Sequence, residues 1–188
     1  MFNAIETRHE AAERRRGYNH RIDFTMMYVA HEAFSRDLRL ILEACQSGDA
    51  LAEATIETWR FFNHQLHVHH TAEDEALWPD LQKVATSGDH MLLLAEHMQH
   101  EEMEALALVE ALLGEQGWSA FSTETRSRID GMGGGATYPP WVLDGADAAT
   151  RDAVLKVIPL PARALFRRVW EPKHRASGRL VVAGGVDG

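Results

Sequence analysis

Histidine and glutamate recur at helical spacing in one part of the chain. Seven of the eleven histidines fall between positions 64 and 100, and the pairs His69/Glu73 and His97/Glu101 are each spaced four positions apart. Residues i and i+4 of a helix share a face, so each pair offers an imidazole nitrogen and a carboxylate to one point in space. Such donors, converging from separate helices, suit iron, manganese or zinc. Hydrogen-bonded ion pairs among the same side chains are the alternative.

Apolar residues recur at three- and four-residue steps along each of three segments and would form one face, or stripe, of a helix. The polar residues above interrupt these stripes. His31 lies on the stripe through positions 24, 27, 31, 34, 38 and 41, and each His/Glu pair replaces aliphatic residues on a later stripe. Burying charged groups without compensation costs several kcal/mol each, so something must satisfy them. His90 lies on the third stripe but 11 positions before Glu101. Off the stripes lie four histidines that we interpret as flanking groups: His64, His67, His70 and His100.

Three amphipathic helices are predicted to position these side chains. They cover residues 22–44, 51–84 and 89–113, and Pro79 is expected to bend the second near its end. Together they form an all-α, up-down helical bundle over residues 20–118. Residues 119–146 are rich in glycine and proline and are predicted to be a linker. Residues 147–176 are predicted to be a C-terminal helical extension, whose second helix reaches Trp170 and is stopped by Pro172. Six Arg/Lys lie between positions 163 and 179, and we expect this arm to pack on the bundle.

Composition excludes several functional classes. The chain has 188 residues, 45% hydrophobic content and a net charge of −9, which disfavours binding to nucleic acid. The lone Cys45 cannot form an internal disulfide, and the first 20 residues lack the apolar run of a signal peptide, so a cytoplasmic location is expected. The longest apolar run, residues 91–95, is too short to span a membrane. Nucleophilic triads and phosphate-binding glycine motifs are absent from the sequence.

The two His/Glu segments also resemble each other. Acidic residues follow each glutamate, and a leucine, Leu77 or Leu106, comes four or five positions after it. The two copies lie 28 residues apart. Two pseudo-symmetric helices that present the same ligand types can build a dinuclear centre, each copy supplying one half-site.

Three segments resemble the hemerythrin-like (HHE cation-binding) domain family. They are Val29-Ala-His31-Glu-Ala-Phe-Ser-Arg-Asp37, His69-His-Thr-Ala-Glu73-Asp-Glu-Ala-Leu-Trp-Pro79 and His97-Met-Gln-His-Glu101-Glu-Met-Glu-Ala-Leu106. The segments Pro140-Trp-Val-Leu-Asp-Gly-Ala146 and Val169-Trp-Glu-Pro172 resemble the C-terminal extension of some bacterial members. The resemblance implies a four-helix bundle that holds a non-haem, usually di-iron, site, with a metal-ligand set of His31, His69, Glu73, His97 and Glu101.

The chain departs from the family between its second and last bundle helices. Only 17 residues separate Pro79 from His97, so one helix and its histidine are expected to be missing. Alternatively, His97 belongs to the third helix and the fourth has been replaced. In either case the bundle is expected to be a three-helix remnant whose open groove is filled by the C-terminal helices or by another subunit, as in a homodimer.

The resemblance leaves three functions open. The first is an iron protein that binds or reduces dioxygen, peroxide or nitric oxide in an oxidative-stress response, with at most a peroxide- or oxygen-reducing activity. The second is a non-enzymatic iron-binding or sensing module. The third is a degenerate scaffold without stable metal. Two irons are expected for the first, and manganese or zinc are the other candidate metals.

Overall fold

The computed structural model describes residues 7, 10, 11, 13, 20–84, 106–131 and 134–181. Within these ranges the chain is helical and contains no strand, which confirms the predicted all-α class. The described part also contains no helix that is both long enough and apolar enough to cross a membrane.

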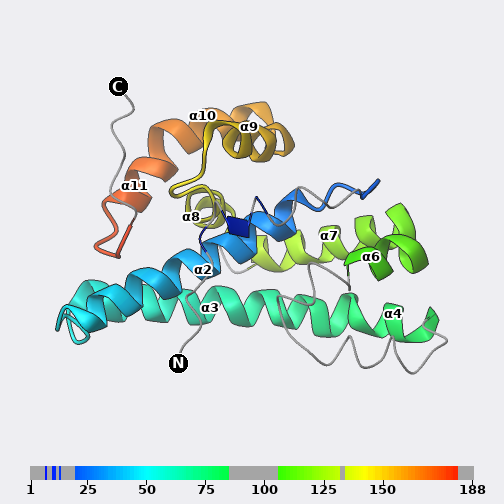
Figure 1. Ribbon diagram of the computed structural model, residues 1–188. Helices are drawn as coiled ribbons and strands as arrows, with labels where there is room; N and C mark the ends of the chain where they lie inside the picture. The colour runs from blue at the N-terminus through cyan, green and yellow to red at the C-terminus, as the bar shows by residue number, and fades with distance from the viewer. Residues whose placement is uncertain are drawn as a thin grey trace.

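An antiparallel pair of long helices forms the base of the bundle (Figure 1). Helix α2 (Thr25–Gln46) and helix α3 (Glu53–Ala76) pack along each other, close to the predicted ranges. The turn between them contains Gly48, whose φ of +89° is unfavourable for residues with a Cβ. The Asp49 amide donates a hydrogen bond to the Ala44 carbonyl oxygen at 2.8 Å and so caps the C-terminal end of α2.

The predicted bend in the second helix is a break. Helix α3 ends at Ala76, Leu77 caps it, and helix α4 (Trp78–Val84) continues beyond it. Pro79 cannot donate a hydrogen bond to the carbonyl four residues earlier, which weakens the helical ladder at this point. Leu77 and Leu81 are nevertheless buried, so the chain keeps its apolar face toward the bundle after the break.

Another long helix packs against α3. A short helix α6 (Leu106–Leu108) and a π-helical turn η2 (Val109–Leu113) lead into helix α7 (Gly114–Gly131). The predicted linker covers residues 119–146, and its first part, residues 119–131, is helical in the structure. Trp118 and Phe121 are buried on the bundle, and the Trp118 indole donates a hydrogen bond to the Asp23 carbonyl at 3.1 Å. Tertiary packing therefore holds α7 despite its polar sequence.

Short helices cover α2 on the side away from α3 (Figure 1). After a 3-10 turn, η3 (Gly134–Ala136), they are α8 (Tyr138–Val142), α9 (Ala148–Val157), α10 (Leu160–Leu165), the π-helical turn η4 (Phe166–Trp170) and α11 (Glu171–Arg175). Helix α8 lies in the segment expected to be a linker. The last helix also continues past Pro172, which occupies its first turn, where a missing amide hydrogen is tolerated. The division into three domains stays a prediction.

A buried ion pair joins this extension to the bundle. Arg36 and Asp37 of α2 are 5% and 3% exposed, and the Arg36 Nη2 donates to Asp37 Oδ1 at 2.6 Å. The same guanidinium donates to the Trp141 carbonyl at 2.7 Å, and the Trp141 indole donates to Asp37 Oδ2 at 2.8 Å. Because each partner satisfies the others, the network fixes α8 on α2 and stabilises two charges that would otherwise be costly to bury.

Candidate metal centre

Three potential metal donors meet between α2 and α3. His31 lies near the middle of α2, and His69 and Glu73 lie one turn apart on α3. The His31 and His69 Nε2 atoms are 3.1 Å apart, and the His69 Nε2 is 2.8 Å from Glu73 Oε1. One donor atom from each residue lies within 4.8 Å of the others, and all three residues are buried. The helical stripes predicted this convergence of the three residues.

The donor chemistry fits a metal cation. His69 Nε2 can carry one proton, yet it lies within hydrogen-bond distance of both an imidazole nitrogen and a carboxylate oxygen. A cation can accept lone pairs from all three groups at once. Two nitrogens bound at about 2.1 Å and roughly at right angles would lie about 3.0 Å apart, close to the spacing of the two imidazoles.

Apolar packing restricts water around this cluster. The Phe34 ring lies 5.3 Å from the His69 ring, and the neighbouring Ala33 and Ala72 are fully buried. Glu32, next to His31 on α2, is also buried at 8% exposure. A low-polarity surrounding strengthens interactions between charges, so a cation here would be attracted strongly by the Glu73 carboxylate.

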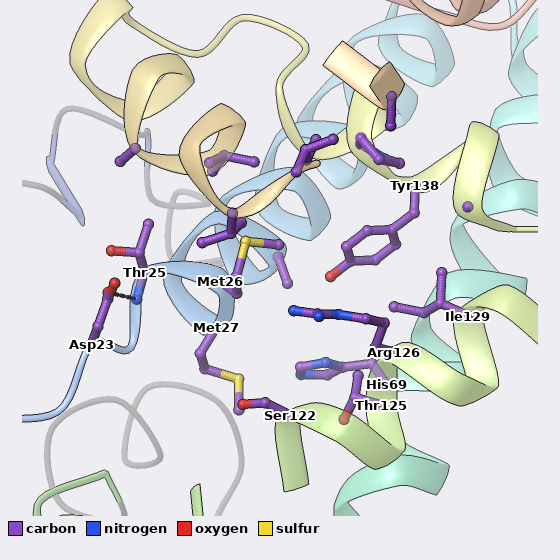
Figure 2. A pocket seen from close by; sticks show the side chains of 18 of the residues that line it. Asp23, Thr25, Met26, Met27, His69, Ser122, Thr125, Arg126, Ile129 and Tyr138 are labelled. Carbon is purple, nitrogen blue, oxygen red and sulfur yellow. Dashed lines mark hydrogen bonds between the residues drawn. The ribbon is translucent and has the colours of Figure 1, made fainter. Parts of the chain in front are cut away.

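A pocket of about 620 Å³ borders the cluster on the His69 side (Figure 2). Tyr138 of α8 points into this pocket. Burial raises the pKa of its phenol, and the negative charge of Glu73 raises it further. The phenol therefore stays protonated at physiological pH and can act as a hydrogen-bond donor near the candidate centre.

The other histidines fall into two groups. His97 and Glu101, which the sequence places in the ligand set, lie outside the described residues, as do His90 and His100. The proposed loss of a helix between Pro79 and His97 concerns the same part of the chain. His64 and His67 are exposed on α3, whereas His70 is half-buried with its ring 6.0 Å from that of His69.

Some residues around the centre were missed by sequence reasoning. It assigned no role to Asp37, Tyr138 or Arg126, although Asp37 belongs to the buried network and the other two line the pocket. Asp37 lies beside the apolar stripe positions 34 and 38 of α2, and a charged residue at the edge of that stripe is a signal that could have identified it. Tyr138 and Arg126 reach the pocket from α8 and α7, and no local pattern indicates that approach.

Comparison with known proteins gives one result. The model of the hemerythrin HHE cation-binding domain matches residues 23–130, which is more than half of the chain. The searches of curated proteins and of solved structures found no match. The matched range contains α2, α3, all but the last residue of α7, and all three clustered donors. The chain therefore belongs to the hemerythrin HHE cation-binding domain family.

Proposed function

We propose that the protein is a non-haem iron protein whose centre holds about two irons. His31, His69 and Glu73 would supply donors from α2 and α3, and His97 and Glu101 would supply the second half-site. The observation that carries the proposal is the meeting of two imidazoles and one carboxylate within 4.8 Å in a buried position. Family membership supports a cation as the ligand of this cluster.

When bound, iron would supply the capacity to bind or reduce dioxygen, peroxide or nitric oxide. The residues of the chain would contribute position and environment. His31 and His69 would hold neutral nitrogens toward the metal, and Glu73 would balance part of its charge. The two carboxylates of the proposed set favour peroxide chemistry over simple reversible oxygen binding, because carboxylates can bridge two metals.

The buried surroundings would protect the centre from bulk water. The Phe34 ring lies against the His69 ring, and all three donors are buried. Tyr138 keeps its proton, so its hydroxyl group can donate a hydrogen bond toward a small polar ligand that enters through the pocket. A small diatomic molecule or peroxide fits these requirements better than a large charged substrate at the centre itself.

The proposal is tested by loading the full-length chain with iron and measuring metal content together with absorption between 300 and 600 nm. We expect about two irons per chain and a near-ultraviolet band of an oxo-bridged pair. His64→Ala serves as a control, because His64 is an exposed histidine on the same helix. Substoichiometric iron without such a band would contradict the proposal and favour an inert hydrogen-bonded network.

Turnover separates an enzyme from a sensing module that shares the site. The iron-loaded protein is mixed with hydrogen peroxide and an electron donor, and peroxide loss is followed. Consumption that His69→Ala abolishes supports a peroxide-reducing activity. Stable iron binding without consumption supports the non-enzymatic alternative.

A further inference from the structure

The pocket beside the candidate centre is large enough for an organic molecule. Its volume of about 620 Å³ lies within the range of roughly 300–1,000 Å³ that is typical of ligand pockets. Side chains from α2, α7, α8 and α9 surround it (Figure 2). Dioxygen or peroxide alone would leave most of this volume unused.

Apolar side chains form most of the pocket wall. They include Met26, Met27, Phe121, Ile129, Val154 and Trp170. Methionine side chains are flexible and polarizable, so they adapt to hydrocarbon or aromatic ligands of different shapes. The wall therefore favours a ligand with an extended apolar body.

Two hydrogen-bond donors point into the same pocket. Figure 2 shows the Arg126 side chain reaching from α7 to lie between the Tyr138 and His69 side chains. In the part of the chain that the structure describes, neither the Arg126 guanidinium nor the Tyr138 hydroxyl has a hydrogen bond or ion pair. Both groups therefore remain available to an acceptor on a ligand.

The donors indicate the chemistry of that acceptor. A guanidinium presents parallel N–H groups that match a carboxylate in two-point contact, and the protonated phenol can donate a further hydrogen bond. The Asp23 carboxylate, the other charged group of the lining, accepts the Thr25 amide at 2.9 Å and lies across the pocket from Arg126 in Figure 2. A negative ligand group is thus favoured at the Arg126 side.

We propose that this pocket binds an organic acid, with its carboxylate at Arg126 and Tyr138 and its hydrocarbon body along the apolar wall. This inference goes beyond the proposed iron function, because neither recognition residue is a proposed metal donor. Binding of the acid requires no metal, and the two proposals can fail separately.

The test uses isothermal titration calorimetry of the full-length chain with dodecanoate, kept below its micelle-forming concentration, with and without iron. Arg126→Gln and Tyr138→Phe remove one donor each and keep most of the side-chain volume. Loss of a charge-assisted hydrogen bond should weaken dodecanoate binding by about tenfold in Arg126→Gln. Tyr138→Phe should weaken it by a smaller factor.

Two controls make the outcome decisive. Arg167→Gln removes an exposed arginine outside the pocket lining and should leave the affinity unchanged. Dodecanol has the same apolar body without the carboxylate and should bind more weakly. Because Arg126 is exposed, its replacement should not disturb folding. The proposal is overturned if dodecanoate does not bind, if dodecanol binds as tightly, or if Arg126→Gln and the wild type have equal affinity.

Discussion

Replacing His69 should remove the stabilisation that iron gives to the fold. Its Nε2 is 3.1 Å from His31 Nε2 and 2.8 Å from Glu73 Oε1, so it is the donor shared by both close contacts of the cluster. Within the cluster, His69→Ala leaves two donors on different helices, His31 and Glu73. Losing a residue that only hydrogen-bonds to a metal ligand already weakens metal binding about 10–100-fold. Loss of the ligand itself should therefore weaken binding by at least about 100-fold.

The expected size of the effect follows from linkage. Free metal at 100 times its Kd stabilises the folded state by about 2.7 kcal/mol, which for a chain of this size raises Tm by about 5–10 °C. A hundredfold weaker site at the same concentration would retain about 0.4 kcal/mol, or about 1 °C. The difference in Tm with and without iron is measured for each protein by calorimetry. This difference cancels any direct effect of the substitution on the metal-free fold.

Two further variants complete the design. Glu73→Gln keeps the side-chain volume but removes the anionic donor, and should lose the iron-dependent shift as well. His64→Ala changes an exposed histidine of the same helix and should keep it. An equal iron-dependent shift in the wild type, His69→Ala and Glu73→Gln would refute the reasoning.

Three other predictions concern stability and ionisation. Asp37→Ala removes the nearer carboxylate of the buried Arg36 and leaves Asp144, whose Oδ2 is 3.9 Å from Arg36 Nε; it should lower the free energy of unfolding by about 3–5 kcal/mol in urea titrations, and a loss below about 1 kcal/mol would contradict the buried ion pair. Although burial alone raises the pKa of Glu110, hydrogen bonds such as that from the Arg21 amide hold it below its ordinary value of 4.5. The stabilisation it gives is therefore present above pH 4.5 and lost as the pH falls through the lowered pKa, and Glu110→Gln should flatten this acid limb of the stability curve. Tyr138 should contribute no phenolate absorbance at pH 10 while the protein is folded, and a phenolate difference between the wild type and Tyr138→Phe at that pH would contradict its burial.

The two long helices and half of the site could be predicted because their signals are local. A regular apolar stripe defines α2 and α3, and helical periodicity alone places His69 and Glu73 on one face. His31 interrupts the matching stripe of α2, which is why its convergence with the pair could be anticipated. Burial of a polar residue on an apolar stripe is informative because it requires compensation.

The remaining elements depend on contacts between distant parts of the chain. Helix α7 has a polar sequence with glycines at positions 114 and 117, and among its described side chains the buried apolar ones are Trp118 and Phe121. The intrinsic helix propensity of α7 is weak, so packing against the rest of the fold determines that this segment is helical. Similarly, Trp141 becomes part of the core through Asp37, more than 100 positions earlier in the chain. Spacing within one segment carries no information about such a contact.

The central claim is that His31, His69 and Glu73 bind metal. It is tested most directly by a crystal structure of the iron-loaded protein, with anomalous difference maps recorded on both sides of the iron absorption edge. We predict an iron peak about 2.0–2.3 Å from the Nε2 atoms of His31 and His69 and from a Glu73 carboxylate oxygen. Iron bound elsewhere, with these three side chains hydrogen-bonded only to one another, would contradict the claim.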